Sequence, residues 1–415
     1  MKSNKKISIF EHQRLRLGEH GFTQTHLDAL LKLNDYHQGQ YFEPIAKGIK
    51  FNQYVGVIQI NGLTIEINPK ADKDDPDDRW KGVLLKMLKA CGRIKASSTG
   101  PAHVKRQHLN LLEVYFELYL LEVEGLIRRG LINRYRIHRG NLNALKGKLE
   151  FAQHIHHNLI HKERFYTSHQ VYDKLHLVHQ IMNEALEIVD QFTSGTRLYD
   201  LCKRVRLNYP LVDSKNITEQ HFNTIRLDRK TASYNYVLEL ARLIILHYSP
   251  DITSGKERML SLLFDMNQLW EEYILKQLKK AAVGTDFIVS GQESKGFWGS
   301  NSLRPDIVIR RGSKTYIIDT KWKRPSSNAA SVGDLRQMYA YCRYWDAEKA
   351  LLLYPGNKAN NTFNKYKTDD YAELEGSVDE IHHYCKMGFV SVISEETGQL
   401  DETIGIRVLE LLEIA

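Results

Sequence analysis

The segment that decides the fold is Arg304-Pro305-Asp306-Ile307-Val308-Ile309-Arg310-Arg311-Gly312-Ser313-Lys314-Thr315-Tyr316-Ile317-Ile318-Asp319-Thr320-Lys321. Two apolar runs rich in β-branched residues flank the pair Gly312-Ser313. Such runs are typical of strands, and a Gly-Ser pair between them is typical of the two-residue turn of a β-hairpin. The segment therefore predicts a hairpin whose two strands meet at this turn.

The turn determines which residues face one another across the expected strands. Arg311 faces Lys314, and counting outward from this pair places Asp306 directly opposite Asp319. Lys321 lies two residues beyond Asp319 and therefore on the same face of the hairpin. Like charges directly opposite each other are destabilising. The two carboxylates thus need a compensating charge, and a divalent cation supplies one.

The two carboxylates and the lysine suit phosphodiester hydrolysis. Mg²⁺ prefers carboxylate and water oxygens as ligands, and it can acidify a bound water and neutralise charge on a phosphate. A neighbouring lysine can orient that water or stabilise the transition state. We therefore expect Asp306 and Asp319 to bind Mg²⁺ or Mn²⁺, and Lys321 to act in catalysis. In the alternative interpretation, the segment is an exposed hairpin edge that carries charges.

An amphipathic helix precedes the hairpin and offers a third acid. Its apolar residues recur at helical spacing, at Leu263, Met266, Trp270, Tyr273, Ile274 and Leu278. The Pro-Asp and Asp-x-Lys pattern resembles the core of the PD-(D/E)xK nuclease superfamily, in which an acid of the first helix often completes the metal site. The resemblance favours Glu271 over Glu272, because Glu271 directly follows an aromatic residue. The alternative is that both glutamates are solvated.

A second helix is expected after the hairpin. Gln337 and Tyr341 are four residues apart and share a helix face. This Gln-x-x-x-Tyr helix resembles the final motif of RecB-like nucleases, which implies that Gln337 approaches the metal site and the nucleic-acid backbone. The next apolar run, residues 350–354, predicts a buried strand. The order helix, hairpin, helix, strand favours a mixed sheet with helices packed against it.

The rest of the chain divides by its patterns into further regions, which makes the expected fold α+β and multidomain. Residues 1–95 contain two alternating runs around Asn61-Gly62, a strong hairpin signal, and we expect a β-rich domain that faces a partner. Residues 96–255 carry several apolar helical stripes and predict a helical middle region. Residues 256–415 are the expected α/β endonuclease domain.

Composition narrows the classes of protein to which the chain can belong. The 415 residues carry a formal net charge of +8, which permits nucleic-acid binding without demanding it. No apolar run reaches membrane-spanning length. Four scattered cysteines fit a reducing cytoplasm and argue against a zinc site. A glycine-rich nucleotide-binding loop is missing, so we expect no nucleotide bound by this chain.

Two polar clusters occur in the middle region. Basic residues between Arg128 and Lys148 are interleaved with an aromatic side chain, which suits a phosphate backbone, an acidic protein or solvent. The second cluster contains His154, His156, His157 and His161. It has no His-Glu-x-x-His motif, so we interpret it as a polar helix face rather than a metal site.

Most of the chain, from about residue 50 to 355, resembles the McrC family of McrBC-type, 5-methylcytosine-specific restriction systems. The segments that carry the resemblance are Leu145-Lys146-Gly147-Lys148-Leu149, Phe165-Tyr166, Asn183-Glu184-Ala185-Leu186, Phe264-Asp265-Met266-Asn267-Gln268-Leu269-Trp270-Glu271, Pro305-Asp306 and Asp319-Thr320-Lys321-Trp322-Lys323. The resemblance implies a magnesium-dependent DNA endonuclease subunit that cleaves modified double-stranded DNA. It also implies a partner, a McrB-like AAA+ GTPase, whose GTP hydrolysis is stimulated by residues within 1–250.

Two other functions remain compatible with the residues. A stand-alone RecB-like repair nuclease would use the same site, although the chain contains no helicase motif. A non-catalytic assembly factor could keep a nuclease fold only as a scaffold, but a scaffold has no need for the opposed carboxylates Asp306 and Asp319. The two alternatives differ from the first function in whether the chain needs a GTPase partner and whether it cuts DNA.

Overall fold

The structure, a computed structural model, describes residues 5–60, 62–69, 78–94, 111–229, 231–250, 258–323, 325, 329–367, 382–394 and 397–414. The chain forms two compact units. Unit 1 comprises Met1–Val57, Gly62–His108 and Leu263–Ala415, and unit 2 comprises Ile58–Asn61 and Leu109–Leu262. This grouping differs from the expected division at residues 95 and 255, because the N-terminal and C-terminal parts of the chain pack into one unit.

The C-terminal part of unit 1 is built on a six-stranded mixed sheet with the order β12-β15-β16-β17-β19-β18. The strands are β12 (Phe287–Gly291), β15 (Ile307–Arg311), β16 (Lys314–Thr320), β17 (Ala347–Pro355), β18 (Asn364–Lys365) and β19 (Tyr384–Val390). Pairing is antiparallel from β12 to β16 and parallel from β16 through β17 to β19. The expected mixed sheet is therefore confirmed.

The hairpin expected at the centre of this sheet is formed by β15 and β16. Its register pairs Arg311 with Lys314 and Ile307 with Ile318, as the sequence predicts. Gly312 has a φ of 58° in the turn, a left-handed conformation that glycine adopts without the penalty of a Cβ atom. Asp319 lies on β16, beside Leu352 of the parallel strand β17. The hairpin thus brings the end of β16 into the middle of the sheet.

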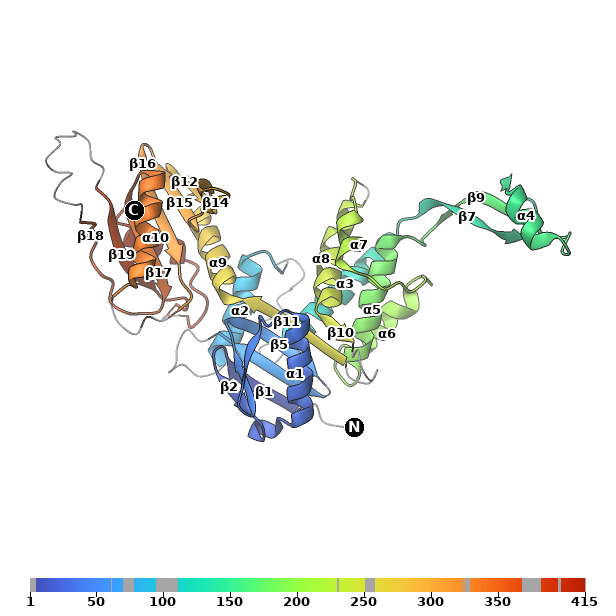
Figure 1. Ribbon diagram of the computed structural model, residues 1–415, viewed down its shortest axis with the longest axis horizontal. Helices are drawn as coiled ribbons and strands as arrows, with labels where there is room; N and C mark the ends of the chain where they lie inside the picture. Colours follow the sequence, from blue (N-terminus) through green and yellow to red (C-terminus); the bar gives the residue numbers. More distant parts are fainter. Residues whose placement is uncertain are drawn as a thin grey trace. The chain divides into compact units, whose positions relative to one another are not determined.

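Helices α9 (Met266–Ala281) and α10 (Val332–Trp345), labelled in Figure 1, lie beside the sheet, and α11 (Ile404–Leu411) packs against α9 and β19. The expected first helix begins at Met266 rather than Leu263, because the Asp265 side chain accepts from the amides of Asn267 and Gln268 and caps the helix there. Leu263 lies instead on the preceding strand, β11 (Arg258–Asp265). The core between α10 and the sheet contains Val308, Ile317, Met338, Cys342, Trp345 and Leu352.

The N-terminal part of unit 1 contains the expected strands and also two helices that were not expected. The elements are β1 (Lys5–Phe10), β2 (Arg14–Arg16), α1 (Gln24–Tyr36), β3 (Phe42–Ile45), β4 (Gly48–Phe51), β5 (Tyr54–Ile60), β6 (Leu63–Asn68) and α2 (Asp78–Ala90). A three-stranded sheet has the order β2-β4-β3, and a five-stranded sheet has the order β1-β6-β5-β11-β10, with β10 at Tyr248–Pro250. Strands β5 and β6 are neighbours, but Asn61 of the expected turn lies outside the described residues.

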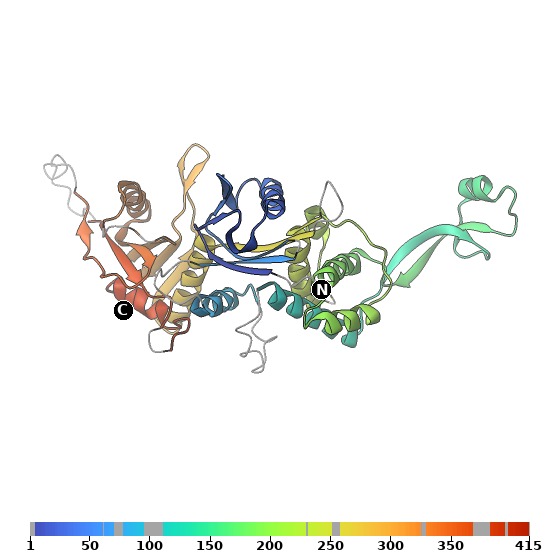
Figure 2. The ribbon, with the colours of Figure 1, turned by 90° about the horizontal axis from the view of Figure 1, so that it is seen from below.

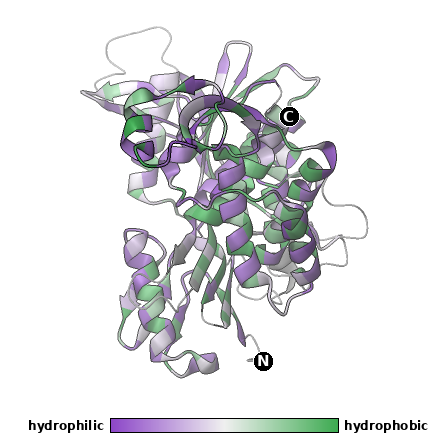
Figure 3. Ribbon diagram, turned by 90° about the vertical axis from the view of Figure 1, so that its right-hand side faces the viewer, coloured by the Kyte–Doolittle hydropathy of each residue, from purple (hydrophilic) through white to green (hydrophobic). Residues whose placement is uncertain are grey.

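Unit 2 contains the three helices that the apolar stripes predict, which are α3 (Leu111–Arg129), α5 (Leu177–Thr193) and α8 (Asn235–Leu246). It also contains α6 (Tyr199–Asn208) and α7 (Glu219–Thr224), which no stripe predicted. Purple and green stretches alternate along individual helices in Figure 3, which is the distribution of an amphipathic helix. Within the described part of the chain, no helix is both long and apolar enough to cross a membrane.

The middle region is not purely helical, which corrects the expectation for residues 96–255. Strands β7 (Arg134–Leu142) and β9 (Phe165–Asp173) pair antiparallel, and β8 (Lys148–Leu149) pairs with β9. Helix α4 (Phe151–Asn158) lies between β8 and β9 in the chain. Together, residues 134–173 form an arm that extends away from the helices of unit 2 (Figure 1).

Candidate active site

Asp306 lies immediately before β15 and is held by the end of β16. Its Oδ2 atom accepts hydrogen bonds from the backbone amide of Thr320 at 2.7 Å and from the Thr320 hydroxyl at 2.8 Å. Hydrogen bonds to a carboxylate are stronger than those between neutral groups. Thr320 therefore fixes the Asp306 carboxylate at the open end of the hairpin, opposite the turn.

Asp319 is the most buried acid of the site, with 2% of its surface exposed. Its Oδ2 atom lies 2.6 Å from the Nζ atom of Lys321. Burial and the negative charge of Asp306 raise the pKa of Asp319 to about 6, even though Lys321 acts in the opposite direction. A raised carboxyl pKa means that burial away from water, or a nearby negative charge, destabilises the ionised form of the acid.

The ammonium of Lys321 is positioned by two partners on different elements. It forms the ion pair with Asp319, and it donates to the Oε1 atom of Gln337 on α10 at 3.4 Å. Burial lowers the pKa of Lys321, but the carboxylates of Asp319, Asp334 and Asp306 outweigh this effect and hold the pKa above its usual value. Lys321 therefore remains a cation in the site.

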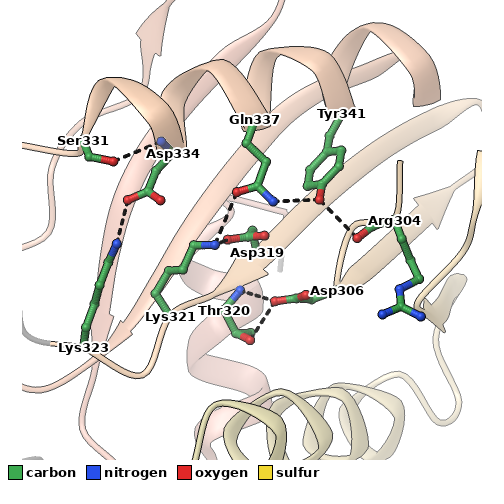
Figure 4. Close-up of polar contacts among 10 residues, drawn as sticks. All are labelled: Arg304, Asp306, Asp319, Thr320, Lys321, Lys323, Ser331, Asp334, Gln337 and Tyr341. Atoms are coloured by element: carbon green, nitrogen blue, oxygen red, sulfur yellow. Dashed lines mark hydrogen bonds and ion pairs between the residues drawn. The ribbon is translucent and has the colours of Figure 1, made fainter. Parts of the chain in front are cut away.

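Gln337 and Tyr341 extend this arrangement across one face of α10 (Figure 4). The Nε2 atom of Gln337 donates to the Tyr341 hydroxyl at 2.8 Å, and that hydroxyl donates to the carbonyl oxygen of Arg304 at 3.1 Å. The chain of contacts thus runs from Lys321 to the segment that carries Asp306. The expected Gln-x-x-x-Tyr helix links both strands of the hairpin.

Glu271 lies on α9, and its Oε1 atom accepts a hydrogen bond from Gln292. Burial and the charge of Asp306 raise the pKa of Glu271, although the hydrogen bond from Gln292 opposes the shift. Glu272 instead forms an ion pair with Arg93, at 2.6 Å. Of the two glutamates, Glu271 is the one whose pKa is raised by the charge of Asp306.

The donor set of the site suits a metal that needs few protein ligands. Among the described residues, no group of three or more His, Cys, Asp or Glu side chains is arranged to hold a metal ion. Glu271, Asp306 and Asp319 thus do not form a preassembled three-acid cage. Mg²⁺, however, is usually bound through one or two carboxylates together with waters and substrate phosphates. Burial and then the charge of Asp306 raise the pKa of Asp319, and a bound cation would offset both effects.

Several residues that hold the site could not be identified from the sequence. Trp322 follows Lys321 directly, and its Nε1 atom donates to the Oε1 atom of Glu11 at 2.7 Å. Both side chains are buried, and the Trp322 ring lies 5.5 Å from the ring of Trp270 on α9. Glu11 belongs to no sequence motif, because its contact with Trp322 depends only on where the N-terminal strands pack. The position of Thr320 inside the Asp-x-Lys motif was the one local signal available.

The two polar clusters of the middle region both lie on the arm or beside it. His154, His156 and His157 lie on α4, whereas His161 lies after the helix, with its Nδ1 atom 3.2 Å from Glu163. His154 contacts Asn158 through Nδ1, at 3.1 Å. The interpretation as a polar helix face thus describes three of the four histidines.

The sequence matches the family described as McrBC 5-methylcytosine restriction system component over residues 49–355. A curated relative, the Type IV methyl-directed restriction enzyme EcoKMcrBC of Escherichia coli (strain K12), is 22% identical over 226 residues. These residues are 51% of this chain and 64% of the relative, so the chain spans less than two thirds of that relative's length.

Two solved structures from Thermococcus gammatolerans are similar in fold. One is a half-complex from a tetradecameric assembly of McrB AAA+ hexamers with bound McrC; the TM-score is 0.68 at 20% identity, over 98% of this chain and 100% of that chain. The other is the McrBC complex determined by cryo-EM, with a TM-score of 0.50 at 21% identity, over 66% of this chain and 87% of that chain. At these identities the likeness concerns the fold.

Proposed function

Because the chain belongs to the family of McrBC 5-methylcytosine restriction system components, we propose that it is the DNA-cleaving subunit of a modification-dependent restriction complex. The reaction is metal-dependent hydrolysis of a phosphodiester in double-stranded DNA. The observation that carries this proposal is the convergence of Asp306, Asp319 and Lys321 at one end of a single hairpin. The mixed sheet around the hairpin supports a PD-(D/E)xK domain in the C-terminal part of unit 1.

Each residue of the site has a distinct role in this proposal. Bound Mg²⁺ would acidify a water molecule and neutralise charge on the phosphate. Asp306 and Asp319 hold the ion, with Glu271 as the third acid. Lys321 orients the attacking water or stabilises the charge that develops in the transition state. Gln337 is a positioning residue, because it acts by holding the Lys321 ammonium.

We also propose that the chain acts with an AAA+ GTPase similar to McrB. The assembly of McrB AAA+ hexamers with bound McrC, which matches this chain in fold, supports such a partner. The arm, residues 134–173, is the part of unit 2 best suited to reach it. Large hydrophobic side chains on the arm are more than half exposed, at Tyr135, Ile137, Leu145, Phe151, Ile155, Leu159, Ile160 and Tyr172. Many exposed apolar side chains within one segment are typical of a surface for a protein partner.

The test compares DNA cleavage with GTP hydrolysis by the partner, for the wild-type chain and for Asp319→Asn. The variant should abolish cleavage of methylated duplex DNA, since it removes a carboxylate ligand, while circular dichroism shows an intact fold. GTP hydrolysis should still rise when the variant is added. Undiminished cleavage by the variant would refute the site assignment.

The same assay separates the two alternative functions. Robust, specific cutting by the chain alone would favour a stand-alone repair nuclease, because the proposal expects efficient cutting only with the GTPase. Without the GTPase we expect weak, non-specific DNA binding, with a Kd on the order of 10⁻⁴–10⁻⁶ M at physiological salt. A wild-type chain that stimulates GTP hydrolysis but never cuts DNA would favour a non-catalytic assembly factor.

A further inference from the structure

A short hairpin stands directly before the Asp306 segment. Its strands are β13 (Lys295–Trp298) and β14 (Asn301–Leu303), which form a separate two-stranded sheet. In Figure 2 this hairpin, drawn in light orange, projects from its unit. Leu303 at the end of β14 is followed by Arg304, whose carbonyl accepts from Tyr341. Any ligand held by the hairpin would therefore lie close to the candidate site.

The hairpin is anchored to the helix that positions Lys321. The Nζ atom of Lys295 donates to the carbonyl of Tyr344 at 2.6 Å and lies 4.8 Å from the centroid of the Trp345 ring. The ring of Phe297 packs edge-on against Tyr344, with centroids 5.5 Å apart. Tyr344 and Trp345 form the last turn of α10, so these contacts set the direction of the hairpin relative to Gln337.

The tip of the hairpin, in contrast, is open to solvent. Trp298 is 75% exposed, although tryptophan has the largest apolar surface of any side chain. A Cβ atom built on either glycine of the hairpin, Gly296 or Gly299, would meet no atom within 4 Å. Nothing among the described residues covers this tip. An exposed indole on an anchored hairpin is typical of a contact surface for another molecule.

The charge of the hairpin favours one class of ligand for this contact surface. Residues 294–304 contain two cations, Lys295 and Arg304, and no acid. The preceding acid, Glu293, is paired with Arg310 at 2.6 Å, and this pairing lowers the pKa of Glu293 to about 2. A surface with cations, an aromatic ring and small polar residues suits a polyanion whose bases offer flat faces, which is a nucleic acid.

We propose that Trp298 inserts against the base stack of DNA next to the phosphodiester that is cleaved. This inference rests on the proposed function and adds a residue that positions the substrate. Trp298 pairs with Asn301, and the five peptide units from Asn301 to Asp306 span at most about 18 Å. That reach corresponds to about five base steps of 3.4 Å, so the indole contacts DNA within a few base pairs of the site.

The chemistry of the contact predicts little sequence preference. Every base has a flat aromatic face, so stacking by an indole tolerates all four bases. Aromatic or aliphatic side chains that enter a base step also unstack it and bend the duplex. Trp298 thus holds the DNA backbone in register with Asp306 and Asp319, while recognition of the modification is left to another part of the complex.

The test uses the full-length chain in an Asp319→Asn background, in which DNA is bound but not cut. A fluorescein-labelled duplex that carries 5-methylcytosine is titrated at low salt, where phosphate contacts are strongest, and anisotropy is recorded. Trp298→Ala should weaken binding by roughly 5- to 150-fold, the range for losing one stacked base. Trp298→Phe should retain most of the affinity. Tyr36→Ala, which removes an exposed aromatic ring on α1, is the matched control and should change nothing.

A second readout tests the base stack itself. With the GTPase partner present and a methylated duplex that contains 2-aminopurine, the chain should raise the probe's fluorescence at positions within about five base steps of the cleaved bond, and Trp298→Ala should abolish the change. Unchanged affinity and unchanged fluorescence for Trp298→Ala would overturn the inference, even if Asp319→Asn had confirmed the nuclease. If Trp298→Ala lost the stimulation of the GTPase but kept its DNA affinity, the inference would also be overturned, because the hairpin would then contact the protein partner. Binding that depends on Trp298 in a chain that never cuts DNA would instead refute the nuclease.

Discussion

Gln337 accepts a hydrogen bond from Lys321, with 3.4 Å between the Oε1 and Nζ atoms. The two residues lie on different elements, a helix and the end of a strand, and the contact fixes the ammonium relative to Asp319. Because the other end of the same amide binds Tyr341, Gln337 has little freedom to rotate. The geometry of the candidate site therefore depends on α10 as much as on the hairpin.

Replacement of Lys321 tests its chemical role. Lys321→Ala removes the cation that orients water or stabilises the transition state, and it should lower the single-turnover cleavage rate by about 10²-fold or more. The affinity for Mg²⁺ should change little, since the carboxylates remain. Rapid-quench measurement at saturating metal gives the rate. An unchanged rate would mean that Lys321 serves only as the ion-pair partner of Asp319.

Replacement of Gln337 tests positioning. Gln337→Leu keeps the size of the side chain but cannot hold Lys321, and we expect cleavage to fall by about 10-fold, the scale of one hydrogen bond. Arg336→Ala on the exposed face of the same helix is the control and should cut normally. If both variants cut at the same rate, the Lys321 ammonium is held by Asp319 alone.

Thr320 offers a test of how the Asp306 carboxylate is held. Thr320→Val removes the hydroxyl that donates to Asp306 while keeping the shape of the side chain. The free energy of unfolding in urea should fall by about 1.5–3 kcal/mol, the range for a hydrogen bond to a charged group. Thr320→Ser keeps the donor and should lose much less. Equal losses for the two variants would show that the methyl group matters more than the hydroxyl.

The raised pKa of Asp319 predicts how stability depends on pH. The ordinary value is 3.8 and the value in the fold is about 6, because of burial and the charge of Asp306. The folded protein holds the proton more tightly than the unfolded chain. The stability from the protonated acid is therefore fully present below the ordinary pKa and is lost as the pH rises through about 6. Thermal unfolding of the metal-free protein across this window should show the decline.

Two controls belong to the pH experiment. The difference in midpoint temperature between Asp319→Asn and the wild type should shift in favour of the variant as the pH rises, since asparagine does not titrate. Mg²⁺ should restore stability to the wild type above about pH 6, where the carboxylate is free to bind it. A difference that stays constant with pH would contradict the raised pKa.

The arm can be disrupted at one glycine. Gly147 has a φ of +72°, and a Cβ atom there would lie 2.5 Å from the Ser168 carbonyl on β9. Gly147→Ala should separate β8 from β9, increase hydrogen exchange in β9 and reduce stimulation of the GTPase. Gly195 has a similar φ of +77°, but a Cβ atom there meets no atom within 4 Å. Gly195→Ala therefore measures the effect of backbone strain without a clash. Normal stimulation by Gly147→Ala would exclude the arm as the contact.

The parts of the fold that could be predicted were those with local signals. The β15–β16 register follows from a two-residue turn and from alternation along each strand, both of which lie within 20 consecutive residues. The spacing of Gln337 and Tyr341 likewise predicts a shared helix face, which the structure confirms. These features depend on backbone geometry that neighbouring residues determine.

The elements and contacts that could not be predicted either join residues far apart in the sequence or lack a buried apolar face. In β7 every residue is exposed or half-buried, and its alternation is confined to Arg134-Tyr135-Arg136-Ile137-His138, too short and too polar to mark a buried strand. The hydrogen bond from Gln292 to Glu271 joins a strand end to a helix, and neither residue type indicates the pairing. The three-way division at residues 95 and 255 was expected, and the two-unit grouping was missed, since packing of the two ends of the chain leaves no composition boundary.

The hydrogen bond between Glu11 and Trp322 also sets an order of events during synthesis. The two residues are separated by 311 positions, so Glu11 leaves the ribosome long before its partner exists. Strand β16 ends at Thr320, two residues before Trp322, and Trp322 is then hydrogen-bonded to a segment made at the start. Strand β19 of the same sheet emerges later still. The candidate site is therefore complete only after Trp322 and the later strand β19 have both been synthesised.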